Sequence, residues 1–175
     1  MEFKGYGVSS GIAIGNVVIK KPFEYEITED SVDSVEDAII EFKEILEICR
    51  KDTKKLYEKM LKNSGKKEAE IFQAHLMILK DPEFVDKIIN EIKDSKKNIA
   101  FCLNKTSNEF IKMFENMDNE YLKQRALDIK DIKERLLKIV FNYKEISNIK
   151  RDNQIIVAKE LTPSDTAKLD LEKVK

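Results

Sequence analysis

The fold is organised around residues 68–81, which read EAEIFQAHLMILKD. Apolar side chains recur along this stretch with the spacing of a single helical face: Ile71, Phe72, Ile78 and Leu79. The same face contains His75, the only histidine of the chain. Asp81 and Pro82 follow, and this pair is typical of an N-cap and the first turn of a new helix. The stretch therefore predicts two helices that meet at a corner, with His75 near the end of the first.

Helical periodicity continues on both sides of this corner. Apolar and small residues recur in steps of four and three, as in helices that pack nearly antiparallel against their neighbours. Besides the helix that contains His75, the pattern predicts helices over residues 31–61, 82–94, 99–117 and 120–142. Gly65 follows the first of these, as expected just after a helix C-terminus. The middle of the chain is therefore predicted to be a helical bundle.

The two ends of the chain have a different pattern. Apolar residues punctuated by glycines predict two short strands within residues 1–20. Residues 154–158 form a nearly all-apolar run typical of a buried strand, and a short helix is expected over 165–169. Strands at both ends that enclose a bundle predict a mostly helical α+β chain. In this scheme the bundle, residues 31–143, is inserted into an α/β subdomain formed by residues 1–20 plus 148–175.

Composition limits the classes of function. Hydrophobic residues make up 42% and charged residues 37% of the 175, with five glycines and three prolines, which indicates a soluble, ordered, helical protein. The 32 basic and 33 acidic residues are interspersed, so no basic face supports nucleic-acid binding. No apolar run approaches the roughly 18 residues of a membrane span, and no signal peptide opens the chain. Cys49 and Cys102 lack metal-type spacing, so we expect buried free thiols and a cytoplasmic protein.

Four stretches, in this order along the chain, resemble motifs of Enzyme I of the bacterial phosphotransferase system, the phosphoenolpyruvate–protein phosphotransferase. They are residues 7–15 (GVSSGIAIG), 71–81 (IFQAHLMILKD), 120–132 (EYLKQRALDIKDI) and 155–167 (IIVAKELTPSDTA). In that family a helical subdomain that binds the small phosphocarrier HPr is inserted into an α/β phosphohistidine subdomain that swivels. The resemblance thus implies an HPr-binding bundle on an α/β subdomain that is incomplete here.

The resemblance also implies how activity is divided along the parent protein. In the family, phosphoryl passes from phosphoenolpyruvate to a histidine of the α/β subdomain and then to HPr, which serves sugar transport. The active histidine is expected beyond Lys175, so the chain is expected to hold no catalytic residue and to be inactive alone. A missing C-terminal barrel would bind phosphoenolpyruvate and Mg²⁺ and make the parent transferase a homodimer. No cofactor or metal is expected in this chain, which offers no GxxxxGK[ST] loop and no carboxylate cluster.

The resemblance places the HPr-docking surface on the helices around the corner. The residues that match the docking positions of the family are Ile71, His75, Ile78, Phe84, Leu122 and Arg125. Two of them have alternative interpretations. His75 is a docking residue, a half-buried structural histidine or a phosphoacceptor. Arg125 is either an interface anchor or the partner of Asp128 in an ion pair within one helix.

Three other identities compete with this interpretation. The first is a stand-alone helical adaptor or scaffold without a link to phosphotransfer, which titration with HPr would distinguish. The second is the nitrogen-regulatory paralogue of Enzyme I. The third is a relative of the pyruvate–phosphate dikinase group, which shares the swivelling subdomain, and the helical insertion argues against it.

Overall fold

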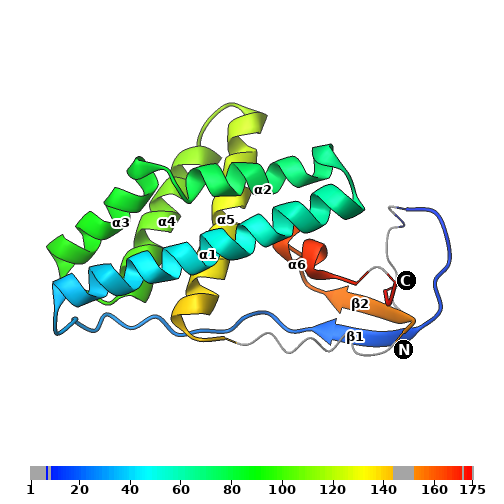
Figure 1. Ribbon diagram of the computed structural model, residues 1–175, viewed down its shortest axis with the longest axis horizontal. Helices are drawn as coiled ribbons and strands as arrows, with labels where there is room; N and C mark the ends of the chain where they lie inside the picture. Colours follow the sequence, from blue (N-terminus) through cyan, green and yellow to red (C-terminus); the bar gives the residue numbers. More distant parts are fainter. Residues whose placement is uncertain (1–6, 8, 144–151, 171, 175) are drawn as a thin grey trace. The chain divides into compact units, whose positions relative to one another are not determined.

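The computed structural model describes residues 7, 9–143, 152–170 and 172–174. Two strands and six helices occur in these residues (Figure 1): β1 (Asn16–Lys20), α1 (Val35–Asn63), α2 (Lys66–Ile78), α3 (Pro82–Ser95), α4 (Ile99–Glu115), α5 (Glu120–Val140), β2 (Gln154–Ala158) and α6 (Pro163–Lys168). All the helices from α1 to α5 lie between the two strands in sequence. The expected α+β fold, mostly helical and with the helices inserted between strands, is confirmed.

The chain divides into two compact units. The strand unit comprises Met1–Pro22, Ile146–Leu161 and Leu169–Lys175, and the helical unit comprises Phe23–Glu145 and Thr162–Lys168. The sequence predicts a bundle of residues 31–143, and the helical unit contains in addition residues 23–30 and α6. Neither segment has a long apolar period, so only tertiary contacts reveal that they belong to the bundle.

The strand unit joins the two ends of the described chain. β1 and β2 pair in parallel, with Val17 opposite Ile155 and Ile19 opposite Val157, as expected for strands separated by an insertion. Gly15 precedes β1 where the backbone carbonyl of Asn153 approaches closely, and a Cβ there would lie 2.2 Å from that oxygen. The register therefore depends on a residue without a side chain. Of the two strands expected in residues 1–20, the earlier one falls mostly outside the described residues.

Capping residues set the helix boundaries. Asp81, Asn98 and Asn119 each accept a hydrogen bond from a backbone N–H of the first turn that follows, as N-caps do. α1 begins at Val35, four residues later than expected, because Ser34 is its N-cap. Ser31 forms instead an isolated antiparallel bridge with Lys97. A polar run before a helix does not reveal which of its serines is the cap.

The main core of the helical unit lies between α1, α3, α4 and α5. α4 packs along α5, α1 lies alongside α2, and α5 crosses both (Figure 1). The largest fully buried side chains of this core are Phe42, Leu79, Ile88, Ile92, Leu103, Ile132, Leu136 and Leu137. A second cluster joins Leu56 of α1, Phe72 of α2 and Ala167 of α6. Burial of these side chains is the dominant stabilising term of the bundle.

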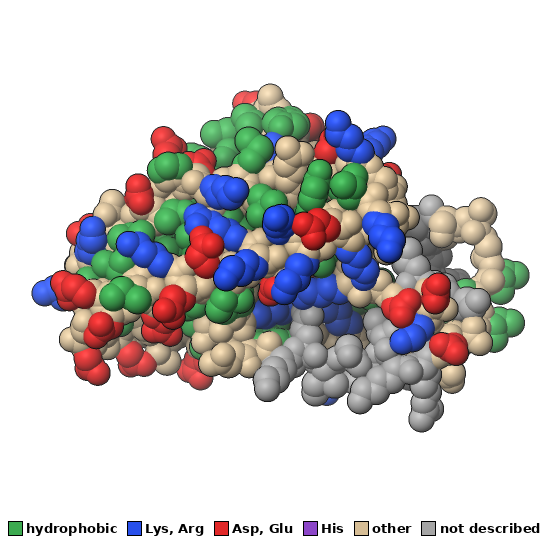
Figure 2. Space-filling view, viewed as in Figure 1, with side chains coloured by type: hydrophobic (Ala, Val, Ile, Leu, Met, Phe, Trp, Pro, Cys, Tyr) green, Lys and Arg blue, Asp and Glu red, His purple; other side chains and the backbone are tan. Residues whose placement is uncertain are grey.

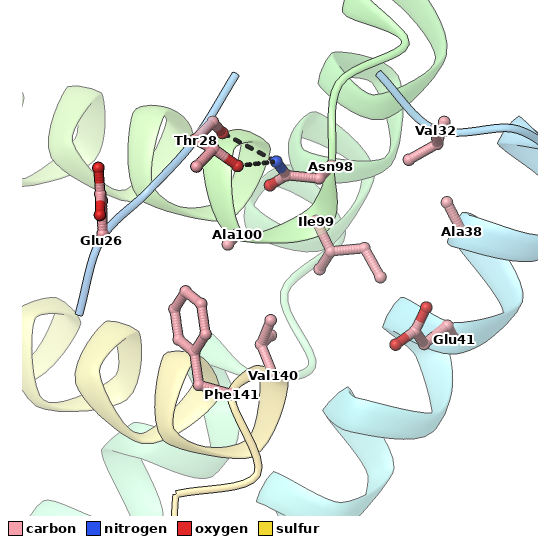
Figure 3. Close-up of a pocket in the computed structure, with 10 residues that line it drawn as sticks. All are labelled: Glu26, Thr28, Val32, Ala38, Glu41, Asn98, Ile99, Ala100, Val140 and Phe141. Atoms are coloured by element: carbon pink, nitrogen blue, oxygen red, sulfur yellow. Dashed lines mark hydrogen bonds between the residues drawn. The ribbon is translucent and has the colours of Figure 1, made fainter. Parts of the chain in front are cut away.

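Residues 23–32 cross one end of the bundle as an extended strap. Its backbone pairs with the α3–α4 turn, where Val32 N–H donates to Lys96 at 2.9 Å and Asn98 N–H donates to Asp30 at 2.9 Å. The Asn98 side chain adds a 2.8 Å bond to the carbonyl of Thr28. A cavity of about 250 Å³ remains between the strap and the ends of α1, α4 and α5 (Figure 3).

An aromatic cluster joins the strap to the end of α5. Phe23 lies 4.6 Å from Tyr143 and 4.8 Å from Tyr25 between ring centroids, and Tyr25 stacks on Phe141 at 5.9 Å. Lys138 Nζ lies over the Phe23 ring at 5.8 Å. Burial, and secondarily the Glu134 carboxylate, raise the pKa of Tyr25. This aromatic cluster brings the beginning of the strap and the residues that follow α5 together.

Two further expectations concern thiols and membranes. Cys49 and Cys102 are free and buried, as expected. Burial raises the pKa of both thiols, so both stay neutral. Across the described ranges, every helix is too short or too polar to cross a bilayer.

Candidate functional site

The corner after α2 is held by an arginine of α1. Arg50 donates from Nε and Nη2 to the carbonyl of Leu79, at 3.0 and 2.6 Å, and also contacts the Glu47 carboxylate. A guanidinium at the end of α2 satisfies a carbonyl that the helix leaves free and complements the helix dipole. Asp81 then caps α3, with its carboxylate accepting from Glu83 N–H at 2.9 Å. The predicted corner is therefore fixed on both sides.

Arg125 lies at the surface of α5, where neighbours restrain it. Its Nη2 donates to the hydroxyl of Tyr121 at 2.6 Å, and the guanidinium lies over the Tyr121 ring, 5.1 Å from the centroid. Nη1 donates to Asp128 Oδ2 at 3.2 Å. The Arg125 side chain is 27% exposed. The intrahelical ion pair expected as an alternative is therefore formed, yet it leaves part of the guanidinium accessible.

His75 lies in the core where α2 crosses α5, and its side chain is fully buried. Its Nε2 lies 3.3 Å from Asp128 Oδ1 and donates to it, because a carboxylate only accepts. Its Nδ1 lies 3.9 Å from Asp131 Oδ2, beyond hydrogen-bond distance. The ring packs edge-on against Phe72, with centroids 5.7 Å apart. The structure thus places His75 as a structural side chain between two carboxylates.

Asp131 connects α5 to α6. Its Oδ2 accepts from Ser164 N–H at 3.1 Å and its Oδ1 accepts from the Ser164 hydroxyl. Both side chains are buried, and Ser164 lies in the first turn of α6, where backbone donors are free. One turn further along α5, buried Arg135 donates to Thr53 Oγ1 at 2.7 Å and to the carbonyl of Cys49 at 3.4 Å. Polar pairs therefore join α5 to both α6 and α1.

The six residues predicted to dock a partner divide into two groups. Ile71, Ile78, Leu122 and Arg125 are partly exposed. His75 and Phe84 are buried, and Phe84 packs against Phe110 of α4 at 5.6 Å between ring centroids. The structure brings α2 and α5 together through His75 and Asp128, whereas Phe84 faces the main core. His75 and Phe84 therefore offer no surface to a partner, because an apolar helical stripe marks burial as readily as docking.

Two exposed apolar side chains near Ile78 and Arg125 were not predicted as site residues. Met77 is 67% exposed near the end of α2 and Tyr121 is 62% exposed in the first turn of α5. Hydrophobic side chains gather over the α4–α5 turn and the beginning of α5 (Figure 2). Large apolar residues off the buried stripe are the signal that would have found them, since each faces water without an obvious benefit to folding.

The other features of the helical unit that bear on ligand binding are its acidic side chains and the cavity beneath the strap. Within the residues that the structure describes, no group of three or more His, Cys, Asp or Glu side chains is placed to hold a metal ion. The cavity beneath the strap is lined by none of the six predicted residues. Its lining includes two glutamates, Glu26 and Glu41, around apolar side chains (Figure 3). The surface around Arg125 combines a partly exposed guanidinium with the exposed side chain of Tyr121.

A helical bundle inserted in sequence between two parallel strands, with a partly exposed arginine on α5, defines an α+β module. The family described as PEP-utilising enzyme, N-terminal, matches residues 4–125, and the chain belongs to this family. Similar proteins are the phosphoenolpyruvate-protein phosphotransferases of Listeria monocytogenes, 41% identical over 177 residues, and of Bacillus subtilis, 38% identical over 176. Each alignment covers 99% of this chain and 31% of the relative, so the chain spans about a third of their length.

Solved structures agree with this assignment. The NMR solution structure of Enzyme I (nEIt) is similar with a TM-score of 0.82 and 34% identity, over 95% of this chain and 68% of that one. The N-terminal domain of Enzyme 1 - Nitrogen is similar with a TM-score of 0.71 and 20% identity, over 94% and 68%. The second likeness, at its lower identity, concerns the fold alone.

Proposed function

We propose that this chain forms the HPr-docking part of a phosphoenolpyruvate–protein phosphotransferase, the Enzyme I that serves sugar uptake. The observation that carries the proposal is the partly exposed Arg125, held in place by Tyr121 and Asp128 beside exposed apolar side chains. An arginine at the edge of a small apolar patch is a common anchor of transient protein interfaces. Higher identity to the structure titled Enzyme I, 34% against 20%, favours that protein over the nitrogen-regulatory paralogue.

The docking surface that we propose differs from the sequence prediction in its members. It consists of Ile71, Met77, Ile78, Tyr121, Leu122 and Arg125. Met77 and Tyr121 add large exposed apolar area, which is the main source of interface energy. Restraint of Arg125 by two neighbours reduces the entropy lost when it engages a partner.

Reversing the charge at Arg125 tests the docking proposal. We expect Arg125→Glu to weaken binding of the HPr from the same organism by about 1–2 kcal/mol, since a charged anchor is replaced by a repelling group. Calorimetric or NMR titration of the whole chain measures the affinity. No binding by the wild type would overturn the proposed function.

The matched control is Lys130→Glu on the same helix. Lys130 is exposed and pairs with Glu115 of α4 at 2.6 Å, so its replacement perturbs a surface ion pair of little energy. Lys138 is less suitable, because its side chain is 11% exposed, pairs with Glu134 and packs over Phe23. Equal affinities of Arg125→Glu and wild type would remove Arg125 from the surface.

We further propose that the phosphoryl chemistry of the parent enzyme takes place outside this chain. The expected active histidine, the phosphoenolpyruvate site, the Mg²⁺ and the dimer contacts all belong to residues beyond Lys175 in this proposal. His75, as the only histidine, has no exposed atom that an incoming phosphoryl group could reach. The protein would act in the cytoplasm, where its phosphate donor is found.

Incubation with phosphoenolpyruvate and Mg²⁺ should therefore leave the chain unmodified. Intact-mass spectrometry is the measurement, with addition of a complete Enzyme I and HPr as the positive control for the reagents. A stoichiometric gain of one phosphoryl group on His75 in the chain alone would contradict the burial of His75. It would also contradict the proposal that the phosphoryl chemistry takes place outside this chain.

A further inference from the structure

We propose that His75 is a positioning residue for docking, which acts through Asp128 on Arg125 and does not touch the partner. This inference rests on the proposed function and concerns the same surface. It assigns a role to a buried polar group that the docking surface itself does not use. Three side chains on two helices carry it: His75 on α2, and Asp128 and Arg125 on α5.

Asp128 bridges the core and the surface. Its side chain is 12% exposed, and its two carboxylate oxygens have different partners. Oδ1 accepts from the buried His75 at 3.3 Å, and Oδ2 accepts from the partly exposed Arg125 at 3.2 Å. A carboxylate is planar, so a donor that holds one oxygen also fixes the direction of the other. His75 thereby determines where Asp128 presents the oxygen that Arg125 binds.

The surroundings of His75 indicate why an imidazole is present. Its neighbours include the apolar Phe72, against which a leucine or methionine would pack without a polar atom to satisfy. Asp131, the other carboxylate facing the ring, is engaged by Ser164 and lies 3.9 Å from Nδ1. Among the described residues, the one hydrogen bond of the His75 side chain is the bond to Asp128. Its polar function is therefore directed at the residue that holds Arg125.

Without the His75 donor, the Asp128 carboxylate is free to rotate toward water or toward Arg125. Arg125 would keep its contact with Tyr121 but lose a fixed second support. A flexible arginine loses more conformational entropy on docking than one already held in place. The expected consequence of losing His75 is weaker docking that depends on the presence of Arg125.

A double-mutant cycle with the HPr from the same organism tests this dependence. We expect His75→Leu to weaken docking about fivefold, and to have no further effect in a chain that already carries Arg125→Gln. His75→Gln keeps a donor near the position of Nε2 and should remain within about twofold of wild type. Leu103→Val, a change in the main core on α4, a helix that carries no residue of the proposed surface, is the control and should leave docking unchanged.

A second measurement is independent of the partner. The Nε–Hε NMR signal of Arg125 in the free chain should show a restrained guanidinium in wild type and His75→Gln, and a mobile one in His75→Leu. Melting curves establish that each variant is folded. If leucine prevents folding, His75→Met provides the same loss of a donor with an adaptable apolar side chain.

The outcomes separate the inference from the proposed function. If wild type does not bind, or if Arg125→Gln binds equally well, the docking surface is wrong. If Arg125→Gln weakens docking but His75→Leu does not, or weakens it equally in both backgrounds, the positioning role is wrong. Failure of His75→Gln to restore affinity would also overturn that role.

Discussion

Replacing Asp131 by alanine is expected to lower the free energy of unfolding of the helical unit by about 3 kcal/mol. Asp131 is 2% exposed and accepts both the N–H and the hydroxyl of Ser164. Its removal leaves the buried Ser164 N–H without its acceptor, leaves the Ser164 hydroxyl with Thr162 Oγ1 at 3.1 Å as its remaining partner, and takes away a carboxylate beside His75. Denaturant unfolding followed by far-ultraviolet circular dichroism measures the effect.

Two control variants are expected to lower the stability less than the loss of Asp131. Ser164→Ala removes only the hydroxyl and keeps the backbone bond, so a loss of about 1 kcal/mol is expected. Lys130→Ala removes a solvent-exposed ion pair on the same helix and should change stability by less than about 0.5 kcal/mol. A change at Asp131 no larger than that at Ser164 would mean that the aspartate is not what attaches α6 to α5.

Removal of most of the strap, residues 23–30, should have an effect of similar size. A chain that begins at Ser31 is expected to be about 3–5 kcal/mol less stable than one that begins at Phe23. The shorter chain loses the ring contacts of Phe23 and the hydrogen bonds that Thr28 and Asp30 accept from Asn98. Both chains lack β1, so the comparison isolates residues 23–30.

The measurement is again denaturant unfolding, with the slope of the transition as a check that the same cooperative unit unfolds. Glu24→Ala within the strap is the control, because its side chain is exposed and none of the bonds above involves it. Equal midpoints for the two shortened chains would show that the strap rests on the bundle without stabilising it.

The helices could be predicted from the sequence because their signals are local. Asp81, Asn98 and Asn119 cap the helices that follow them, and each contact spans no more than three residues. The strap could not be recognised, since its bonds to the α3–α4 turn join residues far apart in sequence. Ser31 illustrates the same limit: it stands before the first helix like a cap, yet tertiary pairing with Lys97 makes it part of the strap.

For the candidate site, the sequence indicates an apolar helical face but does not tell which of its residues are exposed. The periodicity around Ile71 and Ile78 reports which helical face is apolar, and such a face is covered either by its own protein or by a partner. His75 and Phe84 are on the covered part, whereas Met77 and Tyr121 lie exposed outside the stripe. The pairing of His75 with Asp128 crosses two helices, so no spacing within either helix indicates it.

The aromatic cluster bears on how the helical unit could be inserted into another protein. Phe23 and Tyr143, near the two points where the chain enters and leaves the inserted helices, are in ring contact at 4.6 Å. A segment whose ends meet can replace a surface turn of a host protein without stretching it, as successful domain insertions require. Residues 23–143 therefore have the geometry of an inserted domain. The exception is α6, which belongs to the same helical unit but comes from a later part of the chain.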